Sequence, residues 1–252
     1  MVGNLLMRGM LVGILAGLLC FGFLKIYGEP QVDRAIAFET QLDELKAEAD
    51  KAKGMAMPAE EPELVSRAVQ AGVGLFTGVT VYCVGFGGLF ALAFAFAYGR
   101  LEGASTPRGV AALLALAGFV AIYLVPNLKY PANPPSVGDP ATIGSRTALY
   151  FAMIAVSAGT MFLASAMRRS LVPMWGKWNA TLIVAAAYVV VMFVVGLLMP
   201  SVNEVPEQFP AVVLWQFRVA SMGAQIVMWA TMGLVFGALV ERMAPALKTS
   251  AA

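Results

Sequence analysis

The stretch TLIVAAAYVVVMFVVGLLM, residues 181–199, decides the fold class of this chain. It contains no charged residue, and it is about as long as the roughly 20 residues that an α-helix needs to cross the hydrocarbon core of a bilayer. The strands of a membrane β-barrel would instead be segments of about ten residues in which apolar and polar side chains alternate. We therefore expect a membrane-spanning helix here, ended by Pro200.

Apolar runs of similar length occur elsewhere in the chain, and together they predict about six membrane-spanning helices. The whole chain of 252 residues is 60% hydrophobic and 13% charged, with a mean hydropathy of +0.77. A soluble domain is about half apolar and about a quarter charged. The sequence thus predicts an all-α fold, a single polytopic membrane helical bundle. The expected spans are residues 5–26, 72–98, 110–126, 147–167, 180–199 and 219–240.

One segment between the first two spans is charged instead of apolar. Residues 31–53, QVDRAIAFETQLDELKAEADKAK, are rich in alanine and other helix formers, and Pro30 precedes them at a position that suits the first turn of a helix. We expect one charged extramembrane helix here. A polar linker, residues 54–66, should follow it, because it contains the cluster PAEEP at 58–62.

Glycines recur every four residues in three of the apolar runs, which places them on one face of each helix. Such faces let another helix approach closely, so packing is the main interpretation and a compact bundle is expected. The glycines are Gly9, Gly13 and Gly17 in the first run, Gly74 and Gly78 in the second, and Gly233 and Gly237 in the last.

The distribution of charge predicts the orientation of the bundle. With six spans, the two termini and the second and fourth connections share one side, which carries eight basic and two acidic residues. The other side carries nine basic and thirteen acidic residues. Because basic residues in short connections favour the cytoplasm, both termini should be cytoplasmic, in the inner membrane of the cell. The charged helix should lie outside.

Several kinds of chemistry are excluded or unsupported by the sequence. The chain contains no histidine, so a bis-histidine haem site is excluded, and we expect no zinc site either. It has no phosphate-binding G-x-x-x-x-G-K-[ST] motif and no triad, so we expect neither an enzyme nor a bound cofactor, and no nucleic-acid partner. Cys20 and Cys83 fall inside apolar runs without a paired spacing, and are interpreted as small buried hydrophobes.

The three outer connections combine prolines with oxygen-bearing side chains. Proline stiffens a loop and holds neighbouring carbonyls and carboxylates in set directions, so these loops are candidates for binding a cation. The alternative is that the prolines only end helices and the acidic residues only keep the loops soluble. The candidate metal ligands are Glu29, Asp33, Asn133, Asp139, Asn203 and Glu204.

Two further expectations concern charges at these loops. Glu29 and Asp33 lie four residues apart and would stack on one helix face, which is unfavourable unless a cation or Arg34 neutralises them. Arg218, near the start of the last span, could pair with Glu204 or Asp139, or could simply extend its guanidinium to the membrane interface.

The outer loops also carry a family resemblance. The order GEPQVDRAIAFE (28–39), YPANPPSVGDP (130–140), MPSVNEVPEQFP (199–210) and WQFRVAS (215–221) resembles the CbtA family of cobalt-transporter membrane subunits. The resemblance implies a role in cobalt uptake linked to cobalamin supply. It also implies a partner, CbtB, a small single-span protein with histidines, which would supply the nitrogen ligands that this chain lacks.

These observations lead to one functional hypothesis and one alternative. The hypothesis is a membrane subunit that collects a divalent cation, cobalt by resemblance, at its outer face and passes it inward between glycine-lined helices. The driving force would be the membrane potential or a partner. The alternative is a membrane scaffold or assembly subunit that transports nothing, whose glycine faces and charged helix are docking surfaces for partners, lipids or further copies.

Overall fold

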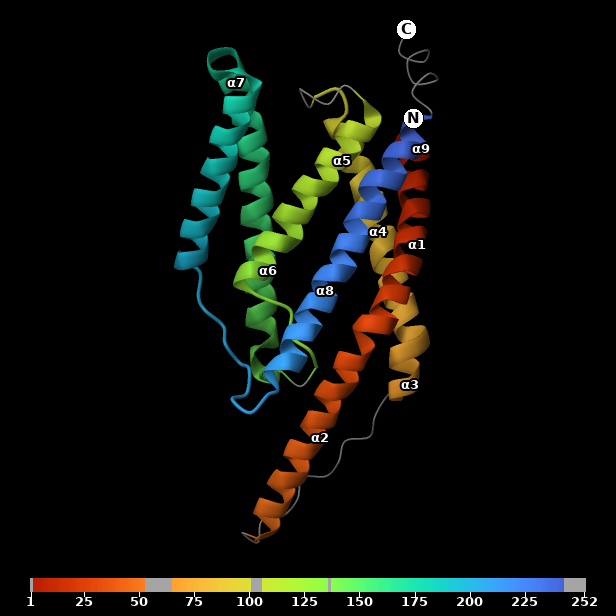
Figure 1. The fold of residues 1–252 in the computed structure, drawn as a ribbon, viewed down its shortest axis with the longest axis vertical. Coiled ribbons are helices and arrows are strands. Elements are labelled where there is room, and N and C mark those ends of the chain that lie inside the picture. The colour runs from red at the N-terminus through yellow and green to blue at the C-terminus, as the bar shows by residue number, and fades with distance from the viewer. Residues whose placement is uncertain (1, 53–64, 101–105, 136, 243–252) are drawn as a thin grey trace.

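The computed structural model describes residues 2–52, 65–100, 106–135 and 137–242, and these residues form helices and loops without a β-strand (Figure 1). The predicted all-α membrane bundle is confirmed. Short π-helical segments, η1 (Gln70–Gly74), η2 (Phe119–Leu124) and η4 (Met232–Phe236), join pairs of α-helices into longer rods, and a 3-10 turn, η3 (Pro140–Thr142), precedes α7. The α-helices are α1 (Val2–Tyr27), α2 (Glu29–Ala52), α3 (Arg67–Val69), α4 (Leu75–Ala97), α5 (Pro107–Gly118), α6 (Val125–Lys129), α7 (Ile143–Leu198), α8 (Ala211–Thr231) and α9 (Gly237–Glu241).

Five helical stretches of the described chain are long and apolar enough to cross a membrane. Many large apolar side chains on them, such as Leu18, Leu116 and Phe193, are exposed on the outside of the bundle. Lipid, not water, is the solvent that suits such a surface. The chain is therefore a multi-pass membrane protein. The stretches are Val2–Tyr27, Arg67–Ala97, Pro107–Lys129, Pro140–Leu198 and Ala211–Glu241.

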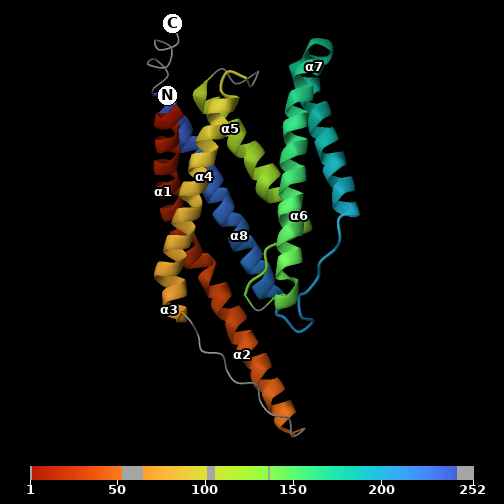
Figure 2. The ribbon, with the colours of Figure 1, turned by 180° about the vertical axis from the view of Figure 1, so that it is seen from behind.

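The fourth stretch contains a pair of helical arms. An unbroken helix of the 56 residues of α7 would be about 84 Å long at 1.5 Å per residue, far more than a hydrocarbon core of about 30 Å. Gly176 breaks it with φ 73° and ψ 165°, a conformation that glycine adopts readily. The chain turns back there, and the arms run side by side in opposite directions (Figures 1 and 2). The predicted spans 147–167 and 180–199 lie one on each arm, and the six crossings stay a prediction.

The connections sort to two ends of the molecule as the six-span arrangement requires. The start of α1, the start of α5, the turn of α7 and the end of α9 lie at one end (Figure 1). The loops on either side of α7 and the projecting helix α2 lie at the other, which we call the outer end. The predicted extramembrane helix is confirmed from Glu29 to Ala52. Residues 53–64, which hold its last residue and most of the predicted linker, lie outside the described residues.

The glycine face of α1 is a packing surface. A Cβ atom at Gly13 would lie 2.5 Å from the carbonyl oxygen of Cys83, and one at Gly17 would lie 2.8 Å from Cα of Thr80. Gly9 is in equally close contact with Gly87. The backbones of α1 and α4 therefore touch along this face, which leaves no room for an ion between them. The packing interpretation is confirmed here, and the idea that this face lines a passage is not supported by this structure.

The other two glycine pairs differ from each other. A Cβ atom at Gly233 would lie 2.7 Å from Cβ of Ala115 on α5, and one at Gly237 would lie 3.0 Å from Cβ of Ala111. At Gly78, by contrast, a Cβ atom would meet no described atom within 4 Å, and at Gly74 it would meet only its own helical neighbour Val69. Close helix approach at the predicted glycines is thus confirmed for Gly233 and Gly237 of the last run. It is wrong for Gly74 and Gly78 of the second run.

Pro126 lies within a continuing helix. The rod that begins with α5 runs through η2 and α6 to Lys129. Proline lacks an N–H group and its ring crowds the carbonyl four residues earlier in an α-helix. The π-helical turn that comes before Pro126 has wider spacing, with bonds to the fifth residue back. That geometry explains how the helix continues past the proline.

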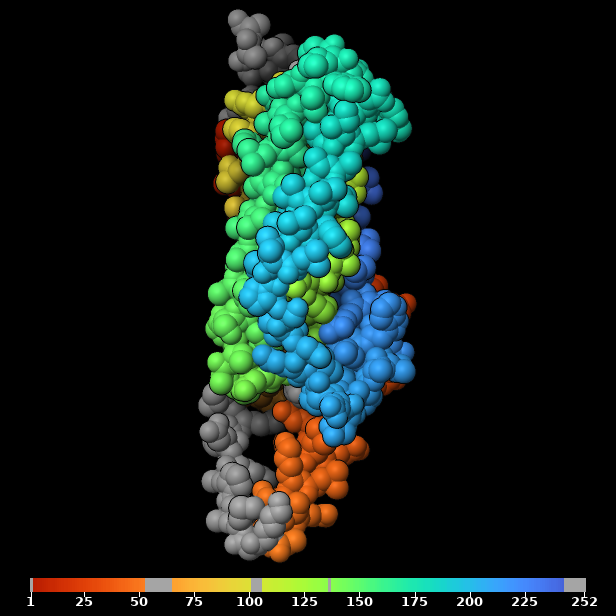
Figure 3. All heavy atoms as spheres, turned by 90° about the vertical axis from the view of Figure 1, so that its left-hand side faces the viewer, coloured from red at the N-terminus to blue at the C-terminus, as the bar shows by residue number. Residues whose placement is uncertain are grey.

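The best-packed part of the bundle is an aromatic core near the end that holds the termini. Phe90 and Phe94, late in α4, pack edge-to-face on Phe236 of η4, with ring centroids 5.4 and 5.2 Å apart. The arms of α7 form one face of the molecule (Figure 3). A smaller cluster that includes Met153 and Tyr188 joins these arms to the rest. The helices α1, α4 and α5 are therefore tightly packed against η4 and α9 at the end that holds the termini.

Candidate functional site

The first two candidate residues, Glu29 and Asp33, lie on one face of α2 as predicted. Their shared counter-ion is Arg67 at the start of α3, whose guanidinium lies 2.5 Å from the Glu29 carboxylate and 2.8 Å from that of Asp33. Arg34, the expected partner, instead donates to the amide oxygens of Gln31 and Gln216. The repulsion between the two carboxylates is thus relieved by an arginine from another helix, and Arg67 ties α2 to the second span.

Glu204, in the loop before α8, is the most connected of the candidate residues. It accepts hydrogen bonds from the hydroxyl of Thr142 at 2.7 Å and from the backbone N–H of Asp139 at 2.8 Å. Arg146 lies 3.3 Å away, with the Glu204 side chain 21% exposed. These hydrogen bonds, with the positive charge of Arg146, lower the pKa of Glu204 below its ordinary value of 4.5. Glu204 is therefore an ionised carboxylate that joins the loops on both sides of α7.

Asp139 and Asn133 use their side chains to hold local structure. The Asp139 carboxylate accepts from the N–H of Ala141 at 2.8 Å, which caps the turn η3. The amide oxygen of Asn133 accepts from Arg218 at 2.8 Å, and Arg218 also donates to the carbonyl of Ala132 at 3.1 Å. The suggested pairing of Arg218 with Glu204 or Asp139 is therefore wrong. Its guanidinium holds the proline-rich loop against α8.

A cavity of about 530 Å³ lies among these groups at the outer end. Three of the candidate residues, Asn133, Asn203 and Glu204, line it, together with the charged side chains of Arg146 and Arg218. Its other polar walls are the side chains of Asn127, Tyr123, Tyr130, Tyr150, Thr147, Ser221 and Gln225. The cavity is thus rich in oxygen atoms and contains one carboxylate and two guanidinium groups.

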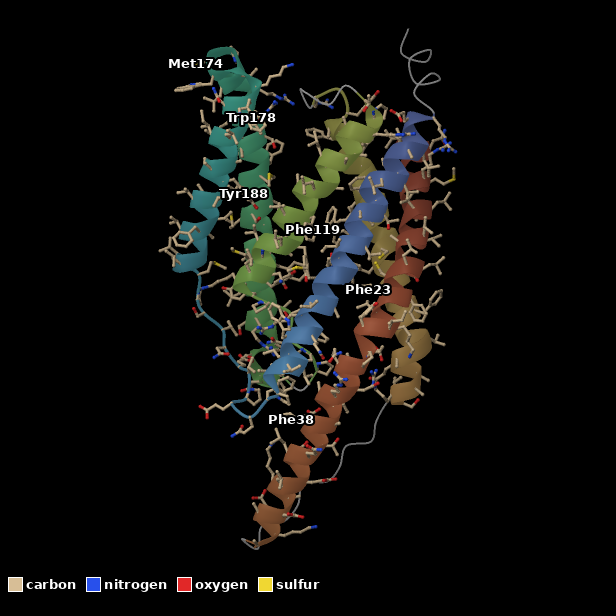
Figure 4. The ribbon with its side chains drawn as sticks, in the orientation of Figure 1. Phe23, Phe38, Phe119, Met174, Trp178 and Tyr188 are labelled. Atoms are coloured by element: carbon tan, nitrogen blue, oxygen red, sulfur yellow. The ribbon has the colours of Figure 1, made fainter. Side chains whose placement is uncertain are left out.

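Contacts between the loops keep the cavity in shape. The hydroxyl of Tyr130 donates to the carbonyl of Pro200 at 2.8 Å. Phe38 of α2 points toward the loop before α8 (Figure 4) and packs edge-to-face on Phe209, with ring centroids 5.2 Å apart. The stiffened outer loops that the prolines predicted therefore form one connected surface with the base of α2.

The six candidate residues do not form a single site. Glu29 and Asp33 share Arg67, whereas the other four surround or adjoin the outer cavity. No group of three or more histidine, cysteine, aspartate or glutamate side chains within the described ranges is arranged to hold a metal ion. Any cation at the outer cavity would meet Glu204 with amide, hydroxyl and carbonyl oxygens, ligands that suit a hard or borderline ion held weakly.

Two residues of the site were missed in the sequence, Arg67 and Arg146. Both lie at the outer edge of an apolar run, one after the polar linker and the other beside Ser145 and Thr147. An arginine at the end of a span is ordinarily explained by the interface. The acidic partners of these two come from distant segments, so no local pattern indicates them.

Comparison with known proteins agrees with the resemblance of the outer loops. No curated protein matches the chain, and no solved structure matches it. The profile of one protein family, described as probable cobalt transporter subunit (CbtA), matches residues 2–241. Because this match covers nearly the whole chain, including every outer-loop residue discussed above, the protein belongs to the CbtA family of probable cobalt transporter subunits.

Proposed function

We propose that this chain is the membrane subunit through which a divalent cation, cobalt by the family's description, is taken up and supplied to cobalamin synthesis. The chain would lie in the inner membrane with both termini in the cytoplasm. The outer cavity would be the entrance. It would have no catalytic role, since a transporter subunit needs none.

The observation that carries this proposal is the outer cavity itself. It combines an ionised carboxylate, Glu204, with the side-chain oxygens of Asn133 and Asn203 in one space of about 530 Å³. Asp139 adjoins it through the hydrogen bond to Glu204. An entrance must bind an ion weakly enough to release it, and one carboxylate with neutral oxygens, opposed by the guanidinium groups of Arg146 and Arg218 in the same cavity, meets that condition.

A cation at Glu204 would take the place of Arg146 as the counter-charge. Arg146 is held by Glu204 and by the carbonyl of Asp139 at 3.1 Å, so it can stay on the carbonyl when the carboxylate turns to an ion. Glu29 and Asp33, further along the outer surface, would act as a separate acidic pair that Arg67 holds until a cation competes for it.

The family description names a subunit, which implies a complex. We infer a partner of the CbtB kind, a single-span protein with histidines, because this chain contains none and Co²⁺ favours nitrogen ligands over oxygen alone. The partner or the membrane potential would drive uptake, the latter by about 2.3 kcal/mol per elementary charge per 100 mV.

One observation favours the scaffold alternative. Helix α2 extends beyond the bundle, and most of its side chains after Phe38 are exposed. Such a charged projection can recognise a partner surface of complementary charge. Purification discriminates between the two functions, because a scaffold gives a stoichiometric complex whose presence does not change cobalt flux.

The test is cobalt accumulation by cells that express the chain with its natural partner. Glu204→Gln keeps the shape of the side chain and removes its charge, and we expect it to reduce expression-dependent accumulation severalfold. Glu207→Gln in the same loop is the matched control, because Glu207 is exposed and is not among the residues that line the cavity. Equal accumulation by wild type and Glu204→Gln would remove Glu204 from the entrance.

A further inference from the structure

The two cysteines of the chain lie in one buried cluster inside the bundle. Cys20 of α1 and Cys83 of α4 are 3% and 1% exposed, and both belong to the hydrophobic core that α1, α4 and α8 share. The Cys20 sulfur also lies 3.3 Å from the carbonyl oxygen of Ala224 on α8. Burial agrees with the interpretation of these residues as small hydrophobes. The sequence did not indicate that both would lie between α1, α4 and α8.

Both thiols line a second cavity, of about 340 Å³, between α1, α4 and α8. Met228, which is 2% exposed, brings a thioether to the same wall. The remaining polar side chains there are Tyr82, Ser221 and Gln225, and none of the described residues that line this cavity is charged. The cavity therefore offers two thiols, one thioether, one amide and two hydroxyls.

The two cavities adjoin each other. Ser221 and Gln225 line both of them. The hydroxyl of Ser221 lies 3.3 Å from that of Tyr123 in the outer cavity, and Gln225 lines the inner one together with Tyr82. Beyond the thiols, toward the termini, the backbone contact of Gly13 with Cys83 and the aromatic core close the bundle. The thiols thus stand at the inner end of a path that the two cavities form from the outer surface.

We propose that Cys20 and Cys83, with Met228, form a binding site for a thiophilic divalent cation, Co²⁺ included, at the inner end of this path. The inference rests on the proposed function, because it names the next site on the same route. Thiolate and thioether sulfur are soft ligands that bind borderline transition metals. They give this histidine-free chain a stronger ligand set than the oxygens of its entrance.

The charge balance favours two cysteines at this depth. An unpaired divalent charge within the bilayer is very costly. Binding converts the two thiols to thiolates and releases two protons, so that the ion with its two sulfur ligands is electrically neutral. No oxidation is involved. Neutrality removes most of the cost of holding the ion among apolar helices, and reprotonation of the thiols would release it.

The direct test is absorption spectroscopy of the purified full-length protein in detergent, kept reduced by a phosphine, with Co²⁺ added as the chloride. We expect a thiolate-to-cobalt charge-transfer band in the near ultraviolet, and release of about two protons per ion. The variant Cys20→Ser/Cys83→Ser, checked for unchanged elution and thermal unfolding, should lose both signals, whereas Glu204→Gln should keep them.

The outcomes separate this inference from the proposed function. A wild-type protein without the band overturns the thiol site, whether or not the double variant folds, and so does a band that persists in the double variant. Cells that lose no cobalt accumulation with the double variant show that the site is not on the uptake path, while uptake itself stands. A band in a protein that drives no accumulation supports the site and contradicts uptake.

Discussion

At the scale of single residues, arginines decide what the acidic side chains of the outer end do. Arg67 draws Glu29 and Asp33 together, and Arg146 does the same for Glu204 and the loop that holds Asp139. Each arginine comes from a segment far from its partners. The acidic residues are therefore structural clamps in the state described, and any cation must compete with a guanidinium to reach them.

The clamp at Glu204 predicts a particular dependence on pH. The pKa of Glu204 is lower in the folded protein than its ordinary value, because Thr142, the Asp139 amide and Arg146 favour the ionised form. A carboxyl group of this kind stabilises the fold above its ordinary pKa and loses that contribution as the pH falls through the lowered folded value. We expect Glu204→Gln to lower the melting temperature at neutral pH and to differ little from wild type in acid.

The measurement is a series of thermal melts of the purified protein from neutral to acidic pH. Glu207→Gln supplies the control, because it removes the charge of an exposed carboxylate in the same loop and should leave the melting temperature unchanged across the series. A difference between wild type and Glu204→Gln that stays constant across the series would contradict the clamp.

At the scale of elements, the helices are held by close backbone contact on one side and by loops on the other. The face of α4 that carries Gly87 meets Gly9 and Gly13 of α1, and the last helix packs on the alanines of α5. The arms of α7 contact the rest mainly near the outer end and through a small cluster. The helices α1, α4, α5 and the last helix are thus tightly packed, whereas the arms of α7 are packed more loosely.

This difference predicts opposite effects for two glycines of one helix. A Cβ atom at Gly87 would overlap the carbonyl oxygen of Gly9, whereas one at Gly85 would meet no described atom within 4 Å. Gly87→Ala should therefore destabilise the protein by about 1–3 kcal/mol through overpacking. Gly85→Ala should be neutral or slightly stabilising, because alanine favours the helix by up to about 1 kcal/mol.

Thermal unfolding in one detergent compares the two variants directly. Their shared gain in helix propensity cancels in the comparison, so the remaining difference reports packing alone. Equal melting temperatures for Gly87→Ala and Gly85→Ala would mean that α1 and α4 do not touch along this face.

At the scale of the whole molecule, the two ends are chemically different. The outer end has the projecting helix α2, the clamped loops and the larger cavity, and the other end has the termini and the aromatic core. The smaller cavity, which shares Ser221 and Gln225 with the larger one, is lined by both thiols. If the termini lie in the cytoplasm as proposed, the larger cavity faces outward and the aromatic core lies toward the cytoplasm.

This arrangement predicts which loops an impermeant thiol reagent reaches in intact cells. The native thiols are buried, so Ser201→Cys and Lys177→Cys, both at exposed positions, can be introduced into the natural chain. Ser201→Cys should label from outside, and Lys177→Cys, in the turn of α7, should label only after lysis. Labelling of both variants in intact cells would show that α7 does not cross the membrane twice, and labelling of Lys177→Cys alone would show that the bundle has the opposite orientation.

The sequence by itself determined the class of the fold, the helical stretches, the charged helix and the two chemically distinct ends, because length and hydropathy of a segment decide whether lipid can surround it. It also carried the family, through the order of motifs in the outer loops. One of its errors, the Gly74 and Gly78 face, arose because spacing indicates a face but not a neighbour.

Only the tertiary structure decided which side chains from distant segments lie together. Arg67 reaches Glu29, Arg218 reaches Asn133 instead of an acidic residue, and Cys20 and Cys83 line one cavity. These partners are separated along the chain by whole helices, and no periodic pattern encodes which helices become neighbours or by how much each is rotated. Packing of the glycine and alanine faces sets that rotation, and with it the places where charges and thiols come together.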